Sequence, residues 1–134
     1  MRALIVDDSR FIRNLLRGLL QAIGFECAEA GNGEDALGVL KASQPFDIAL
    51  VDWNMPVMNG LEFVKQMRAA GFGDAKVLMV TTEGENEFIL RALDAGADEY
   101  LMKPFDGEAL NEKLAMLGLL EDSAPFLAKD ATEA

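Results

Sequence analysis

Histidine is absent from this chain of 134 residues, and cysteine occurs once, at Cys27. Without histidine there is no Ser-His-Asp type of triad, and the commonest general base and the commonest transition-metal ligand are both missing. Without a second cysteine no disulfide forms inside the chain. Any chemistry must therefore come from carboxylates, hydroxyls and lysines.

Long apolar runs and positive charge are also scarce. Fully apolar stretches such as IALV (48–51) and VLMV (77–80) have four residues, far below the roughly 20 of a membrane-spanning helix. The net charge is −11, from 12 basic and 23 acidic residues, which repels a phosphate backbone and an anionic membrane. No N-terminal segment has the features of a secretory signal. We therefore expect a cytoplasmic protein that binds neither nucleic acid nor membrane.

The remaining composition predicts one α/β domain, because 51% hydrophobic residues can bury a core without metal or disulfides. Short apolar segments lie at 3–6, 25–30, 47–51, 76–80 and 99–102. A stretch with helical spacing follows each of them, and the four after the first lie at 33–42, 60–70, 85–95 and 107–118. Strands that are apolar on both faces and alternate with helices form parallel sheets covered on both sides. The predicted class is a three-layer α/β fold.

The first predicted helix carries a wide apolar stripe at three- and four-residue steps, which Gly24 ends. The stripe consists of Phe11, Ile12, Leu15, Leu16, Leu19, Leu20 and Ile23. Gly71 and Gly96 are predicted to cap two later helices. We expect the folded domain to span 1–120, and segment 121–134, with one proline and little periodicity, to be a weakly ordered acidic tail.

Polar side chains follow four of the five predicted strands: Asp7 and Asp8, Asp52, Thr81 and Thr82, and Lys103. In doubly wound sheets, ligands bind outside the carboxyl ends of the strands. Carboxylates gathered there repel one another by about 4 kcal/mol per pair at 4 Å and an effective dielectric of 20. A hard divalent ion such as Mg²⁺ relieves this repulsion and leaves open positions for phosphate oxygens. With Lys103 adding positive charge, the site suits a phosphoryl group.

Each of these residues also has a simpler interpretation. Asp7 and Asp8 are good helix caps in isolation, and Asp52 and Lys103 taken singly are ordinary loop and surface residues. Thr82 is interpreted as a helix-start residue. Convergence at adjacent strand ends favours a functional site over these separate explanations.

Four motifs in order give the chain a resemblance to response-regulator receiver domains, particularly the stand-alone CheY type. They are VDD (6–8), DWNMPVMNG (52–60), VTTEG (80–84) and DAGADEYLMKPF (94–105). The resemblance runs from residue 2 to about residue 119. It implies a flavodoxin-like fold with five helices and a five-stranded parallel sheet in the order 2-1-3-4-5.

The resemblance also implies a role for each site residue. Asp52 would accept a phosphoryl group from a phosphohistidine, Lys103 and Thr81 would contact the phosphoryl oxygens, and Mg²⁺ would be the cofactor. The expected metal ligands are Asp8, Asp52 and the main-chain carbonyl of Asn54, with Asp7 holding a coordinated water.

Two further pairs follow from the same resemblance. Asn54 and Glu83 would tune hydrolysis of the acyl phosphate. Thr81 and Tyr100 would form a switch in which the ring turns inward. The simpler interpretation of Tyr100 is an amphipathic edge residue with a solvated hydroxyl. In the family, the peptide bond before the proline of this motif is cis. Here that bond joins Lys103 to Pro104.

The expected protein is a monomeric phosphoacceptor that takes part in its own phosphorylation and dephosphorylation, and is not otherwise an enzyme. Its expected partners are a sensor histidine kinase, CheA-like or another, and a protein target such as a flagellar switch component; a phosphatase partner is left open. Two alternatives are a receiver-like module that works without phosphorylation and an aspartate-nucleophile phosphohydrolase. The latter would want an acid two residues after Asp52, where Asn54 stands.

Overall fold

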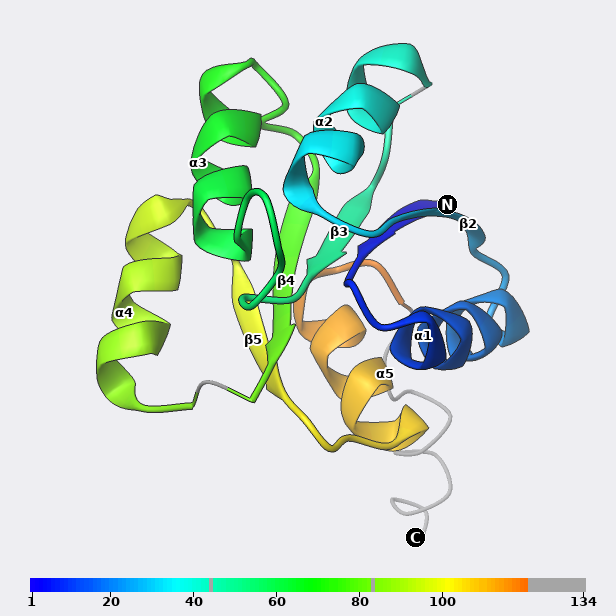
Figure 1. The fold of residues 1–134 in the computed structure, drawn as a ribbon. Coiled ribbons are helices and arrows are strands. Elements are labelled where there is room, and N and C mark those ends of the chain that lie inside the picture. The colour runs from blue at the N-terminus through cyan, green and yellow to red at the C-terminus, as the bar shows by residue number, and fades with distance from the viewer. Residues whose placement is uncertain (44, 83, 121–134) are drawn as a thin grey trace, which may run out of the picture.

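The structure, a computed structural model, describes residues 1–43, 45–82 and 84–120. Strands and helices alternate along this part of the chain (Figure 1). They are β1 (Arg2–Val6), α1 (Arg10–Ala22), β2 (Glu26–Ala30), α2 (Gly33–Ala42), β3 (Ile48–Val51), α3 (Gly60–Ala69), β4 (Lys76–Thr81), α4 (Asn86–Ala95), β5 (Glu99–Met102) and α5 (Gly107–Met116). The bounds lie within two residues of those predicted. The predicted tail, 121–134, lies outside the described residues.

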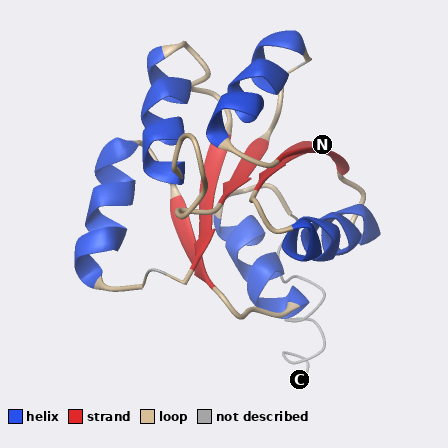
Figure 2. Cartoon of the chain, viewed as in Figure 1, coloured by secondary structure: helices blue, strands red, loops and turns tan. Residues whose placement is uncertain are grey.

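The strands form one parallel sheet in the order β2-β1-β3-β4-β5. This confirms the order that the family resemblance implied. Helices α1 and α5 cover one face of the sheet, and α2, α3 and α4 cover the other, so the fold has three layers (Figures 1 and 2). None of the helices described is long and apolar enough to cross a membrane.

Alternation along the central strands builds a core on each face of the sheet. Leu4, Ile5 and Val6 are all fully buried. Leu4 and Val6 belong to the cluster beneath α2, α3 and α4, whereas Ile5 belongs to the cluster beneath α1 and α5. Successive side chains of a strand point to opposite faces, so a strand covered on both sides must be apolar throughout. This explains the unbroken apolar runs in the sequence.

Only part of the apolar stripe of α1 is buried. Leu16 and Leu20 are buried against the sheet, but Phe11 is 75% exposed and Leu15 is 38% exposed. A helix packed on a sheet can bury only the side that faces it, so a stripe this wide extends onto the solvent side. Phe11 and Leu15 therefore lie on the solvent side of the stripe.

The carboxyl ends of β1 and β3 lie side by side in the middle of the sheet. Val6 pairs with Val51, and the amide of Asp52 donates to the carbonyl of Val6 over 2.9 Å. At the neighbouring edge, the amide of Lys103 donates to the carbonyl of Thr81 over 2.9 Å. The strand pairing thus fixes the backbone positions from which the candidate site residues project.

Gly60, the first residue of α3, is required by a close approach between backbones. A Cβ atom at this position would overlap the main-chain oxygen of Asp52, and the Gly60 amide donates to the carbonyl of Trp53 over 2.8 Å. Its φ is not positive, so no turn conformation requires a glycine here. Its function is to let the start of α3 lie against the loop that follows β3.

Gly60→Ala should lower the free energy of unfolding by about 1–3 kcal/mol, the usual cost of overpacking. Gly18→Ala is a matched control in α1, because a Cβ there meets nothing within 4 Å; it should raise stability by about 0.5–1 kcal/mol through helix propensity. Urea denaturation followed by circular dichroism measures both changes. Equal stability of Gly60→Ala and the parent would contradict the close-approach explanation.

Candidate functional site

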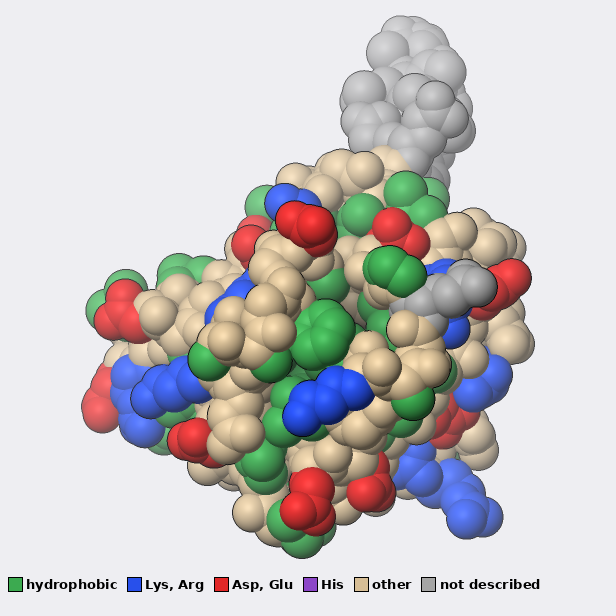
Figure 3. Space-filling model, turned by 90° about the horizontal axis from the view of Figure 1, so that it is seen from above, with side chains coloured by type: hydrophobic (Ala, Val, Ile, Leu, Met, Phe, Trp, Pro, Cys, Tyr) green, Lys and Arg blue, Asp and Glu red, His purple; other side chains and the backbone are tan. Residues whose placement is uncertain are grey.

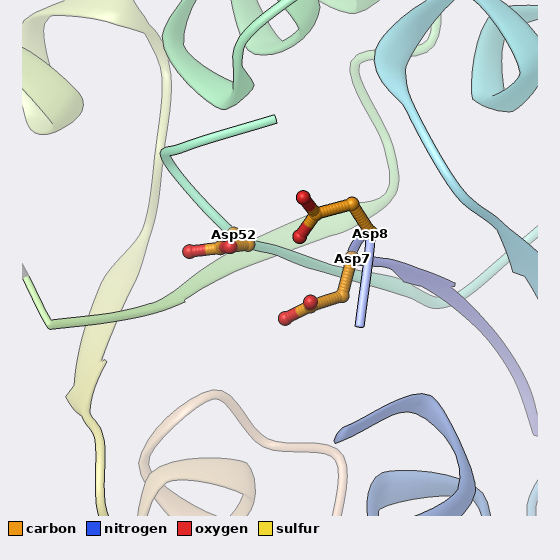
Figure 4. Close-up of side chains that lie close together, drawn as sticks. All are labelled: Asp7, Asp8 and Asp52. Atoms are coloured by element: carbon orange, nitrogen blue, oxygen red, sulfur yellow. The ribbon is translucent and has the colours of Figure 1, made fainter. Parts of the chain in front are cut away.

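Three carboxylates converge at the carboxyl end of the sheet (Figure 4). Asp7 and Asp8 follow β1 and Asp52 follows β3, and one oxygen of each lies within 4.8 Å of the others. Asp7 and Asp52 are buried, at 1% and 7% exposure, while Asp8 is exposed. The cluster is therefore open to solvent on the Asp8 side and closed beneath the other two.

Lys103 reaches into the cluster from the residue after β5. Its Nζ lies 2.9 Å from Oδ2 of Asp7 and 3.6 Å from Oδ2 of Asp52. The peptide bond between Lys103 and Pro104 is cis, as the family resemblance implied. The sequence placed these residues at separate strand ends, and the structure brings them into direct contact.

The helix-cap interpretation of the two aspartates is wrong, because Ser9 has that role. The Ser9 hydroxyl accepts a hydrogen bond from the amide of Ile12 over 3.2 Å. Asp7 Oδ1 instead accepts from the amide of Ser9 over 2.8 Å. Both oxygens of Asp7 are thus engaged, one by Ser9 and one by Lys103.

The charge on Asp52 is poorly compensated. Burial raises the pKa of its carboxyl above the ordinary value, and the nearby charge of Asp7 raises it further. Lys103 and the main-chain N–H groups of Trp53 and Asn54 oppose this increase of the pKa but do not cancel it. A cation at the cluster would favour the ionised form. An all-oxygen, partly hydrated set of carboxylates fits a hard divalent ion.

The profile of the family described as response regulator receiver domain matches residues 3–115. This chain belongs to the response-regulator receiver family. The receiver fold places its acidic cluster where the doubly wound sheet binds ligands, outside the carboxyl ends of the strands.

Named relatives of this receiver are chemotaxis proteins. Chemotaxis protein CheY1 of Helicobacter pylori is 40% identical over 119 residues, which cover 87% of this chain and 96% of that protein. The CheY homolog of Campylobacter jejuni is 40% identical over 116 residues, covering 85% and 89%. The structure of CheY4 from Vibrio cholerae matches with a TM-score of 0.81 at 38% identity, covering 87% of this chain and 97% of that one. A CheY-like receiver of Methanospirillum hungatei gives 0.79 at 33% identity, covering 87% and 91%.

The other candidate residues of the receiver surround the cluster or lie behind it. Thr81 ends β4 and is fully buried, and Tyr100 in β5 is 7% exposed within the core beneath α3 and α4. Tyr100 thus lies in the edge strand β5 with its side chain largely buried. Asn54 is exposed beside Asp52. Glu83 lies outside the described residues.

Thr82 does not start a helix, contrary to the sequence interpretation. The N-cap of α4 is Glu85, and Thr82 is exposed in the preceding loop. The chain needs several more residues after β4 before it turns into α4.

Sequence reasoning missed a contact between the Asp52 loop and α4. Trp53 packs edge-on against Phe88, with ring centroids 5.1 Å apart at an interplanar angle of 86°. The guanidinium of Arg91 lies 5.5 Å from the centre of the Trp53 ring. Edge-on contacts between two aromatic rings are attractive, and so are contacts between a cation and the face of a ring. The residue next to Asp52 therefore touches α4 directly, which periodicity alone does not predict.

A small pocket lies at the opposite end of the sheet, where strands begin. Its volume is about 180 Å³, and it is lined by Leu40, Pro45, Phe46, Gly71, Phe72, Asp74 and Ala75. In the view from above, hydrophobic side chains gather near the middle of this end among charged ones (Figure 3). It takes no part in the acidic site.

The raised pKa of Asp52 predicts a pH-dependent stability change. A carboxyl with a higher pKa in the folded state stabilises the fold when protonated, and that contribution is lost as the pH rises through the folded-state pKa. With divalent ions chelated, Asp52→Asn should therefore melt above the parent at pH 7, and the gap should shrink towards about pH 4.

Thermal unfolding followed by circular dichroism across this pH range checks the prediction. Asp74→Asn, an exposed acid at the opposite end of the sheet, serves as the control and should show no such trend. An advantage of Asp52→Asn that stays constant with pH would contradict the electrostatic cause.

Proposed function

We propose that this chain is a single-domain response regulator of a two-component phosphorelay, in which Asp52 accepts a phosphoryl group from a sensor histidine kinase. One observation carries the proposal: Asp52 is buried beside Asp7 and Lys103 and shares a potential metal site with Asp8. Family membership supports the kinase partner, since receivers act as phosphoacceptor modules. The pair of alternatives, a phosphorylation-independent module and a phosphohydrolase, lacks comparable support.

The donor set supports Mg²⁺ as the cofactor. We assign Asp8, Asp52 and the main-chain carbonyl of Asn54 as ligands. Asp7 already gives one oxygen to Ser9 and the other to Lys103, so it suits contact with the ion through water. When bound, the ion would supply positive charge for the approaching phosphoryl oxygens.

Phosphotransfer then takes place between Asp52 of this site and the phosphohistidine of the kinase. A carboxylate oxygen of Asp52 forms a bond to phosphorus as the phosphorus–nitrogen bond of the kinase phosphohistidine breaks, and the departing imidazole takes up a proton. Lys103 pairs with one phosphoryl oxygen, and the Thr81 hydroxyl donates to another. The absence of histidine from this chain is no obstacle, because the kinase brings it.

The signal would leave the site through Thr81 and Tyr100, towards the surface formed by α4, β5 and α5. Movement of Thr81 biases a two-state equilibrium in which the Tyr100 ring takes part. Large hydrophobic side chains are exposed on this surface, which supports protein binding there: Leu90, Leu93, Met102 and Met116.

A chemotaxis role is the specific form of this proposal. The relatives at 40% identity are named chemotaxis proteins, which supports a CheA-like kinase and a flagellar switch component as partners. We propose a cytoplasmic monomer. The phosphohydrolase alternative remains disfavoured, because Asn54 stands where that chemistry needs a second acid.

Incubation with Mg²⁺ and a small-molecule phosphodonor should add one phosphoryl group, measured by intact mass. Asp52→Asn should abolish the added mass, because it removes the nucleophilic carboxylate. Asp74→Asn, which changes an exposed acid at the far end of the sheet, should label like the parent. Normal labelling of Asp52→Asn would exclude the assigned acceptor, and release of free product from a phosphomonoester would favour the phosphohydrolase.

Asn54→Leu should slow the spontaneous loss of the phosphoryl group, because a bulky apolar side chain beside Asp52 hinders the attacking water. The main-chain carbonyl of residue 54 is kept, so Mg²⁺ affinity should not change. A dephosphorylation time course after donor removal, with metal affinity measured alongside, checks this. Asn14→Leu, the same change at an exposed position of α1, is the matched control and should decay like the parent. Equal decay of Asn54→Leu and the parent would mean that water access past residue 54 does not limit the lifetime.

A further inference from the structure

An arginine on α1 touches the backbone between the two adjacent aspartates. Nη1 of Arg13 donates to the main-chain oxygen of Asp7 over 2.5 Å, and its Nε donates to Oε1 of Glu29 over 2.9 Å. The Arg13 side chain is only 17% exposed. It therefore links β2, α1 and the acidic loop within the folded domain.

Glu29 anchors this arginine together with a second one. Arg17, one helical turn further along α1, donates its Nε to the other oxygen of Glu29 over 2.5 Å. Burial raises the pKa of Glu29, but hydrogen bonds from Arg17 and Arg13 outweigh it, so the pKa is lowered overall. Glu29 is thus a charged anchor for two guanidinium groups, only one of which reaches Asp7.

The contact acts on the orientation of both carboxylates. The oxygen that Arg13 binds belongs to the peptide unit joining Asp7 to Asp8. Because that unit is planar, fixing its oxygen fixes the direction in which the Asp8 backbone leaves it. The Asp7 amide is held in turn by the carbonyl of Ala30 over 3.1 Å, so both sides of Asp7 are fixed to the protein.

We infer that Arg13 is a positioning residue for the acidic site, holding the Asp7–Asp8 peptide so that both side chains face the bound cation. This rests on the proposed function insofar as the cation is Mg²⁺. The hydrogen bonds of Arg13 go to the main-chain oxygen of Asp7 and to Glu29, not to the carboxylates of the cluster. It acts through the main chain, as groups behind a metal ligand do when they orient it.

Arg13→Gln and Arg17→Gln form a matched pair for the test. Each removes one guanidinium from Glu29, but only the first removes the bond to Asp7. Mg²⁺ titration followed by fluorescence of Trp53, the single tryptophan, gives the dissociation constants. Arg13→Gln should weaken binding roughly tenfold, whereas Arg17→Gln should change it by less than about twofold, as for a partly exposed ion pair.

A second readout uses the metal-free protein. The amide nitrogen of Asp8 belongs to the peptide that Arg13 binds, so its ¹⁵N chemical shift should change in Arg13→Gln and stay constant in Arg17→Gln. Circular dichroism verifies folding of both variants. If Arg13→Gln does not fold, Arg13→Lys replaces it and should also weaken Mg²⁺ binding, because a single ammonium cannot reproduce the fork that spans Asp7 and Glu29.

The outcomes separate this inference from the proposed function. Equal Mg²⁺ affinities for the two variants would overturn the positioning role, since any effect would then come through Glu29. Failure of the parent itself to bind Mg²⁺ would overturn the proposed cofactor. In that case the ¹⁵N chemical shift of the Asp8 amide decides. A change of this shift confined to Arg13→Gln supports the positioning role, and no change overturns it.

Discussion

Mutual repulsion among carboxylates is the constraint on which the rest of this structure depends. Asp7, Asp8 and Asp52 bring oxygens within 4.8 Å of one another, and each pair of charges at such a distance costs about 4 kcal/mol at an effective dielectric of 20. A flexible loop would relax by moving the side chains apart. Here two paired central strands, fixed by hydrogen bonds and buried on both faces, prevent that movement.

The positive charge of Lys103 compensates the repulsion unevenly. Lys103 lies closer to Asp7 than to Asp52, and Ser9 engages the other oxygen of Asp7. Asp7 is therefore satisfied within the protein, whereas Asp52 keeps a raised pKa and Asp8 faces solvent. Because of this uneven compensation, binding of a cation and then of an anion would lower the electrostatic energy of the site. A reversible phosphorylation site requires this property.

In the switch proposed above, changes at Asp52 would have two physical routes to the surface. One would pass through Thr81 and Tyr100, which are buried on the neighbouring strands. The other passes through Trp53, whose ring contacts Phe88 and Arg91 on α4. Both reach α4, so a displacement of the loop after β3 and a displacement of Thr81 would act on the same helix. Packed contacts of this kind transmit discrete rearrangements because interiors are dense.

The sequence by itself determined the elements, their alternation and the polar residues at the strand ends, because periodicity and strand composition depend on local spacing; the family motifs added strand order and site roles. Only the tertiary structure decided which side chains meet. It showed Ser9 as the cap, Phe11 facing solvent, Gly60 against the Asp52 backbone, and Arg13 on the main-chain oxygen of Asp7. These partners come from separate elements, and spacing along one element carries no information about what another element brings to it.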